Sequence, residues 1–337
     1  MKHFRFSLII SLFCLLAAFL WAGKIGVFIA LILGILEVSL SFDNAVVNAS
    51  ILKRMDARWQ FYFLTWGILI AVVGMRLVFP VAIVSVATGL DFLGVAEMAY
   101  KDTATYAIHL HESHLQIATF GGMFLLMVFF SFIFDEGKKL HWLGKLEKKI
   151  ASFGKLESIE IVVALSLLFY LQTWLAPDQR LEAMLAGTFG VILFVLVDSL
   201  AVLFENNEQG QEISEGIKKG GLMNFIYLEV LDTSFSFDGV IGAFAITQDV
   251  IIIMLGLAIG AMFVRSLTVF LVRQGTLDNY VFLEHGAHYA IGALAVIMLI
   301  SIKIPVSEII TGLTGAILIS LSVYSSIRYK KRINAAD

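Results

Sequence analysis

The sequence predicts an all-α polytopic membrane protein, and three observations lead to this fold class. Of its 337 residues, 59% are hydrophobic and only 15% are charged. The mean hydropathy is +0.89, which is far above that of soluble globular proteins. Apolar runs long enough to cross a bilayer recur from one end of the chain to the other. Such runs satisfy their own backbone within lipid by forming helices.

The apolar runs predict about ten transmembrane helices in chain order: 5–22, 25–52, 60–88, 115–134, 158–176, 181–204, 221–247, 249–272, 280–302 and 306–327. The first run follows Lys2 and Arg5 as in a signal peptide. No clear small-residue cleavage site comes after it, so we expect a retained helix. The single cysteine, Cys14, excludes an internal disulfide and a thiolate metal cluster.

Basic residues predict the orientation of these helices. If the N-terminus is cytoplasmic, eighteen Lys and Arg residues fall on the cytoplasmic side, with six of them in 135–157. The opposite side receives only Lys24, Lys101, Arg180 and Lys303. Cytoplasmic loops of membrane proteins carry such an excess of positive charge. We therefore expect both termini in the cytoplasm.

Two carboxylate-bearing segments inside apolar runs resemble each other. Both read Ser-Phe-Asp, ending at Asp43 and Asp238, and both carry an acid six residues before that aspartate (Glu37 and Asp232). The spans that follow them contain a glycine and an arginine at equal separation: Gly67 and Arg76, then Gly256 and Arg265. Five spans separate the equivalents, so the two halves insert with opposite topology.

The repeat predicts the organisation of the chain. We expect one membrane domain over 1–337, in which 25–134 and 221–302 are inverted three-helix repeats. Between them, 135–220 forms a lysine-rich cytoplasmic loop and two linking spans. The remaining 303–337 forms the last span and a basic cytoplasmic tail.

The acidic segments are the candidate functional site. A carboxylate within a bilayer costs roughly 2.5–3.5 kcal/mol on insertion scales, so it is rarely without a function. Oxygen ligands without cysteine suit Mg²⁺, Ca²⁺ or Mn²⁺. The candidate metal-site residues are Glu37, Asp43, Asn44, Glu229, Asp232 and Asp238, with Ser41, Ser236, Arg76 and Arg265 supporting them and with Asp198 and His285 ranked lower.

Helix geometry and charge constrain this site. At 100° per residue, a straight helix cannot direct both Glu37 and Asp43 at one point. Either the helix is broken there or each acid faces a different neighbour. The five acids exceed Arg76 and Arg265 by three negative charges. A divalent cation leaves one charge that a proton can cancel, which favours exchange of metal for protons.

Two loops stand out from the short connections. The lysine-rich 135–157 is compatible with an amphipathic surface helix near anionic lipid, and a solvated linker is the simpler interpretation. On the outer side, 89–114 contains His109, His111, Glu112 and His114. These side chains are of metal-binding type, and a solvated polar loop is again the simpler interpretation.

The paired acidic motifs resemble those of the TerC/Alx family of integral membrane proteins, within the LysE transporter superfamily. The resemblance covers roughly 25–134 and 221–302. The second motif of this chain departs from the family's, which usually continues Asp-Ser-(Ile/Val)-Pro-Ala, because here Asp238 is followed by Gly-Val-Ile-Gly-Ala and the serine and proline are missing. Together with the four additional spans, this departure indicates a divergent branch. The family is associated with manganese export and, by its name, with tellurium resistance.

The resemblance implies an exporter of a divalent metal cation, Mn²⁺ above others, in the bacterial inner (plasma) membrane. The alternatives are export of Ca²⁺ or Mg²⁺, or a non-transporting component of a metal or tellurite stress-resistance complex. An intramembrane enzyme is disfavoured, since no nucleophile with an adjacent base and no Walker loop occurs. We expect the metal ion, protons and lipid as partners, no covalent cofactor and no nucleic acid. Homo-oligomer formation stays open.

Overall fold

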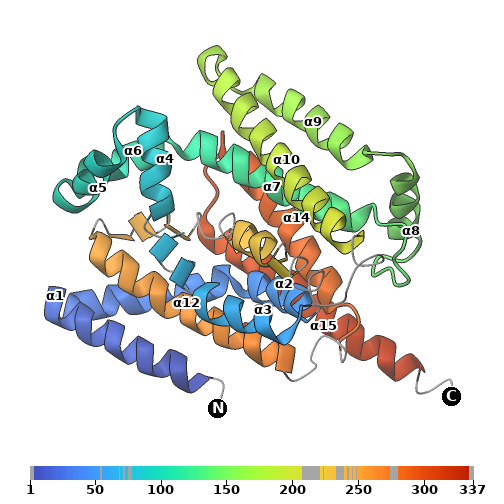
Figure 1. Cartoon of the computed structure of the whole chain (residues 1–337), viewed down its shortest axis with the longest axis horizontal. Helices are drawn as coiled ribbons and strands as arrows, with labels where there is room; N and C mark the ends of the chain where they lie inside the picture. The colour runs from blue at the N-terminus through green and yellow to red at the C-terminus, as the bar shows by residue number, and fades with distance from the viewer. Residues whose placement is uncertain are drawn as a thin grey trace. The chain divides into compact units, whose positions relative to one another are not determined.

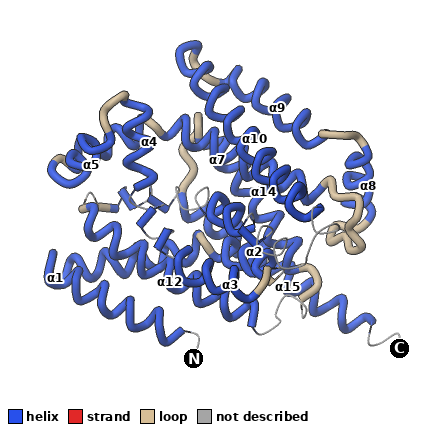
Figure 2. Tube along the Cα trace, in the orientation of Figure 1, coloured by secondary structure: helices blue, strands red, loops and turns tan. Residues whose placement is uncertain are grey.

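The computed structural model describes residues 4–53, 55–67, 69–70, 73–74, 78–206, 221–222, 224–232, 239–240, 243–244, 246–247, 249–273 and 280–333. These residues form helices, turns and loops, and no strand occurs among them (Figure 2). Six described helices are long and apolar enough to cross a membrane, or seven if a bent pair at 145–174 counts as one span. The prediction of a multi-pass all-α membrane protein is confirmed at this level.

The α-helices have the following bounds (Figure 1): α1 Arg5–Leu40, α2 Phe42–Leu52, α3 Ala57–Tyr62, α4 Phe79–Thr88, α5 Phe92–Lys101, α6 Thr103–Glu112, α7 His114–Ile133, α8 Lys145–Ala151, α9 Ile159–Leu171, α10 Pro177–Asn206, α12 Val250–Arg273, α14 Leu283–Ser301 and α15 Glu308–Ile333. A π-helix at Phe63–Gly67 continues α3, and 3₁₀ turns follow α8 and α9.

Contacts within the chain divide it into two compact units. Unit 1 comprises 1–114 and 203–274, and unit 2 comprises 115–202 and 275–337. Each unit therefore combines a segment from the first part of the chain with one from its last part. In unit 1 this brings the described parts of both acidic segments into a single body.

The first helix of unit 1 consists of two limbs. Ala22 (φ −130°, ψ 18°) and Gly23 (φ 62°, ψ −149°) leave the helical conformation within α1, and the chain turns sharply there (Figure 1). Gly23 adopts its positive φ without the steric cost that a side chain would bring. The predicted boundary between spans 5–22 and 25–52 coincides with this kink.

Both limbs of α1 pack on α12. In the first limb, Ser7 Oγ donates to the Met262 carbonyl at 2.6 Å, and Trp21 Nε1 donates to Asp249 Oδ2 at 3.0 Å. This limb is therefore antiparallel to α12. The second limb runs parallel to α12 and approaches it closely, since a Cβ on Gly256 would lie 2.6 Å from Leu33 Cβ. Small residues allow helices in membranes to come this close.

The structure corrects the prediction of a polar loop at 89–114, because most of this segment is helical. Asp91 and Asp102 cap α5 and α6 by accepting hydrogen bonds from the backbone N–H groups of Gly94 and Thr105. Such caps satisfy the first orphan donors of a helix. Tyr106, Ala107 and Leu110 of α6 are buried, so the segment packs on unit 1 rather than lying free in solvent.

Unit 2 is an assembly of antiparallel helices around α14. A Cβ on Gly122 of α7 would meet Leu299 of α14 at 2.9 Å, and one on Gly292 would meet Phe129 at 2.7 Å. On another side, the backbone N–H of Phe282 donates to Ser326 Oγ of α15 at 2.9 Å. Both neighbours therefore run opposite to α14, as the alternating spans predict.

Candidate functional site

The two acidic segments meet in unit 1. Asn48 Nδ2 in α2 donates a hydrogen bond to Asp232 Oδ1 at 2.8 Å, although the residues are 184 positions apart. Glu37 near the end of α1 lies against the second segment, since a Cβ on Gly239 would be only 2.6 Å from Glu37 Oε2. Polar groups of the first segment thus contact the second at two points.

The Glu37 carboxylate is enclosed. Its residue is 1% exposed, and Ser41 Oγ one turn later donates to Oε1 at 3.0 Å. Its aliphatic stem lies against the backbone of Gly260 in α12, where any Cβ would clash. The helix is interrupted at Ser41 (φ −99°, ψ 17°), between α1 and α2. This irregularity falls within the Ser-Phe-Asp motif, and hydrogen bonds between residues four apart continue on both sides of it, from the Ser41 N–H to the Glu37 carbonyl and from the Ala45 N–H to the Ser41 carbonyl.

A second buried acid lies beside the π-helix. Glu229 is 7% exposed, and a Cβ on Gly67 would be 2.6 Å from its Oε1. Gly67 is the last residue of the Phe63–Gly67 π-helix, and its lack of a side chain leaves room for this carboxylate. Widened turns of this kind frequently occur at functional sites. Asn44 is also buried, at 7% exposure.

Several predicted site residues lie outside the described part of the chain. They are Arg76, Ser236 and Asp238, and the side chain of Asp43 is likewise not described. Among the described residues, no three His, Cys, Asp or Glu side chains are grouped as a metal site requires. The metal centre therefore stays a prediction.

Three other predicted residues have different surroundings. Arg265 lies over the Phe6 ring at 5.6 Å, and among the described residues it forms no ion pair with an acid. Asp198 belongs to α10 in unit 2, where it is exposed. His285 also belongs to unit 2, where its Nε2 is 3.6 Å from Glu147 Oε1.

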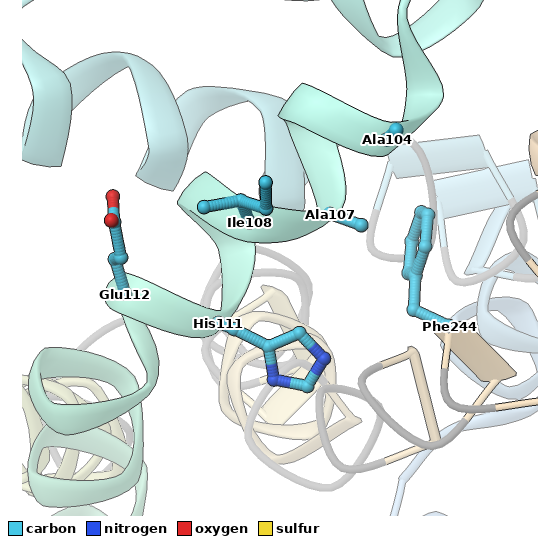
Figure 3. A pocket seen from close by; sticks show the side chains of 6 residues that line it. All are labelled: Ala104, Ala107, Ile108, His111, Glu112 and Phe244. Atoms are coloured by element: carbon cyan, nitrogen blue, oxygen red, sulfur yellow. The ribbon is translucent and has the colours of Figure 1, made fainter.

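Unit 1 also contains the histidines predicted for a loop, His109, His111 and His114. His109 Nδ1 is 3.1 Å from Glu112 Oε2. His111, two residues later, lines a hollow of about 480 Å³ with Ala104, Ala107, Ile108, Glu112 and Phe244. Figure 3 shows the His111 ring and the Glu112 carboxylate pointing in different directions. His109 and Glu112 thus form a close pair, and no group of three or more metal-binding side chains occurs here among the described residues.

Sequence reasoning missed a buried ion pair in unit 2. Lys138 Nζ is 2.9 Å from Glu147 Oε1, and these side chains are 8% and 0% exposed. The Leu143 N–H donates to Glu147 Oε2 at 3.1 Å, and His285 Nε2 is 3.0 Å from the Leu140 carbonyl. We call the contacts of Lys138, Leu143 and His285 with Glu147 the Glu147 clasp.

The clasp determines the charge state of Glu147. Burial acts to raise its pKa, but the hydrogen bonds from Lys138 and the Leu143 backbone, with the nearby positive charge, outweigh burial and lower the pKa below its ordinary value. Glu147 is therefore ionised at neutral pH. The one sequence signal for it is an acid within a lysine-rich run.

Comparison with known protein families identifies a match. A family described as "Protein of unknown function (DUF475)" matches residues 42–333. This range begins within the first acidic segment and includes the whole of the second. No curated protein and no solved structure matches the chain.

Proposed function

The chain belongs to the DUF475 family, and we propose that it is a membrane transporter that exports a divalent metal cation, Mn²⁺ above others, in exchange for protons. The observation that carries this proposal is the hydrogen bond from Asn48 to Asp232. It joins two acidic segments that are remote in sequence, inside a unit built from apolar helices. Ionisable groups in such a setting are costly, and in membrane proteins they commonly mark substrate or ion pathways.

Carboxylate and amide oxygens are the ligands that Mn²⁺ prefers. In this proposal Glu37, Asp43, Asn44, Glu229, Asp232 and Asp238 bind the ion, with Ser41 and Ser236 as further oxygen donors. Arg76 and Arg265 offset part of the negative charge. When the ion leaves, protons replace it on the carboxylates, because an uncompensated cluster of acids in a poorly solvated site favours the neutral form.

We further propose ten spans with inverted repeats at 25–134 and 221–302. Aligning the two Ser-Phe-Asp motifs makes residues 195 positions apart equivalent, which pairs Ser41 with Ser236 and Gly34 with Glu229. In the spans that follow, the equivalent glycines Gly67 and Gly256 are 189 positions apart. The two halves make matching contacts: Glu229 lies on Gly67, and a Cβ on Gly34 would be 3.4 Å from the Gly256 carbonyl. Equivalent positions thus approach each other in both halves, which supports an internal two-fold relationship.

Helix direction supports the proposed topology. The second limb of α1 is parallel to α12, and the first limb is antiparallel to it. If successive spans cross the membrane in alternating directions, span two runs in the same direction as span eight and span one runs in the opposite direction. The excess of basic residues on one side supports our further proposal that both termini are cytoplasmic, in a bacterial inner membrane.

The resemblance to the TerC/Alx family, as a divergent branch, supports Mn²⁺ as the substrate. A second candidate is a non-transporting component of a metal or tellurite stress-resistance complex, which the buried acids of unit 1 do not favour. Other hard cations, Ca²⁺ and Mg²⁺, fit the same ligands. Ion competition in the flux assay below separates them from Mn²⁺.

The test is Mn²⁺ flux into proteoliposomes that contain the purified chain. We expect Asp43→Asn, Asp232→Asn and Asp238→Asn to abolish flux, while Glu97→Gln, which removes an acid that is 62% exposed in α5, leaves flux at the wild-type level. All four variants should insert and purify in equal amounts. Wild-type flux in the Asp232 and Asp238 variants would disprove the site.

Coupling is tested in the same vesicles with a pH-sensitive dye. Under a defined Mn²⁺ gradient, exchange predicts proton movement opposite to the metal. It also predicts that metal affinity rises with pH until the coupled carboxylates are ionised. Flux without proton movement would instead identify a uniporter.

A further inference from the structure

The segment between α7 and α9 has an unusual surface. Around α8, four apolar side chains are exposed: Leu143 47%, Leu146 60%, Phe153 48% and Leu156 56%. Lys139, Lys145, Lys148 and Lys149 are also exposed and lie among them. We call these eight residues the α8 surface. Exposed apolar groups close to cations are typical of helices that lie on a membrane.

The α8 surface is held in a fixed place on unit 2. Lys138 attaches Glu147 of α8 to the start of the segment. His285 of α14 lies 3.6 Å from Glu147, and its Nε2 donates to the Leu140 carbonyl of the same segment at 3.0 Å. A second attachment is at Gly154, whose backbone lies so close to the Phe134 carbonyl after α7 that no Cβ fits. With the acid turned inward, the outer side of the segment is left basic and apolar.

The direction of α8 suits an interfacial position. The helical segment Lys145–Lys155 is bent by 100° from Ile159–Trp174, and Figure 1 shows α8 at an angle beyond the end of α9. Gly144 (φ 61°) and Ser158 (φ 60°) bound the segment with positive φ values. If α9 crosses the bilayer along its normal, a helix bent by about a right angle lies nearly in the membrane plane.

The distribution of charged residues indicates which ligand the α8 surface binds. Within 135–157 the exposed acids are Asp135, Glu136 and Glu157. They lie near the two ends of the segment, and Glu136 is 3.4 Å from Lys155. The central lysines, Lys145, Lys148 and Lys149, have no exposed acid beside them in the α8 helix. A surface with cations around an apolar centre complements anionic headgroups above acyl chains.

We propose that the α8 surface binds anionic lipid, with the lysines contacting phosphate groups and Leu146 and Phe153 entering the acyl boundary. The proposal concerns a face of unit 2 and does not depend on the transported ion. It makes the segment a membrane-bound element rather than a solvated linker. Because the Glu147 clasp connects the segment to α14, lipid bound at the α8 surface is linked through these contacts to a predicted transmembrane helix.

The experiment places a dye sensitive to its environment on the surface. Ser152, exposed beside Lys149, is replaced as Ser152→Cys in a Cys14→Ala background, and the full chain is reconstituted. Vesicles contain brominated phosphatidylglycerol in unlabelled phosphatidylcholine, or the reverse. We expect stronger quenching by the brominated anionic lipid, decreasing as salt screens the lysines.

Matched charge variants decide the outcome. Replacing Lys145, Lys148 and Lys149 together with Gln should lower the preference for anionic lipid by up to about fivefold per lysine. A control that replaces Lys24, Lys101 and Lys303 with Gln changes the net charge equally and should retain the preference. In detergent, both variants should show the wild-type emission, which verifies that the segment is folded.

Three outcomes would overturn the proposal. Equal quenching by both lipids would show that the surface has no anionic preference. Unquenched dye would leave the segment in solvent. A blue-shifted emission that persists in detergent and increases with protein concentration would show that a second copy of the chain covers the surface.

Discussion

Replacing Glu147 with Gln should destabilise unit 2 by about 3 kcal/mol. The side chain of Glu147 is 0% exposed and that of its partner Lys138 is 8% exposed, so the substitution leaves a buried ammonium without its counter-charge. Removing one member of a buried ion pair costs about 3–5 kcal/mol. Gln retains the shape and one acceptor for the Leu143 N–H, which places the cost at the lower end. Trp142 packs edge-on to Tyr289 at 5.5 Å, and its fluorescence can follow unfolding in detergent once the other four tryptophans have been replaced by Phe.

The control is Glu136→Gln, which removes an acid of the same segment from an ion pair that is 67% and 54% exposed. Exposed pairs contribute about 0–1 kcal/mol, so this variant should unfold close to the wild type. Lys138→Met combined with Glu147→Leu removes both charges and should recover most of the lost stability. If Glu147→Gln were as stable as Glu136→Gln, the clasp would not hold the segment.

The remaining predictions concern pH, packing and topology. Because the native pKa of Glu147 is lowered, the stability that this carboxylate contributes is complete above the ordinary glutamate pKa of about 4.3 and is lost as the pH falls through the native pKa. Acid unfolding followed by Trp142 fluorescence should therefore begin at the Glu147 clasp, and Glu147→Gln should remove this pH dependence. Gly67→Ala should reduce Mn²⁺ affinity in binding assays, since its Cβ would displace Glu229. Among the described residues a Cβ on Gly74 would meet Ile70 alone, at an ordinary 3.5 Å, so Gly74→Ala should bind normally. Reporter fusions should place 89–114 outside and 135–157 in the cytoplasm, and finding both on one side would remove the basis for inverted repeats.

Long apolar runs made several helices predictable within a few residues. The predicted spans 115–134 and 249–272 correspond to α7 His114–Ile133 and α12 Val250–Arg273. Polar or charged residues bound both runs, and a continuous apolar stretch has few alternatives to a membrane helix. The kink at Gly23 was predictable for a similar reason, since it separates two runs of bilayer length.

Other features depend on contacts that a linear pattern does not contain. The helices α5 and α6 have only local signals, the capping residues Asp91 and Asp102, in a segment whose polar composition resembles a loop. The Glu147 clasp unites residues from two distant parts of the chain, so no spacing rule reveals it. In the candidate site, the acids could be identified from the sequence. That Gly67 and Gly260 are the glycines packed against Glu229 and Glu37 is seen only in the structure.

The contact between α1 and α12 also limits how unit 1 can move. Leu33 and Glu37 are one turn apart, and each fits against a glycine of α12, Gly256 and Gly260, that are themselves one turn apart. The smallest slide that returns a side chain to a glycine is therefore one turn, about 6 Å, and it would bring the other side chain against Ile252 or Val264. The two helices are therefore held in one register, and we expect them to move as a single rigid body. If the proposed transport occurs, the ion can therefore pass Glu37 only by movement of groups other than these two helices, such as the segment that contains Gly239.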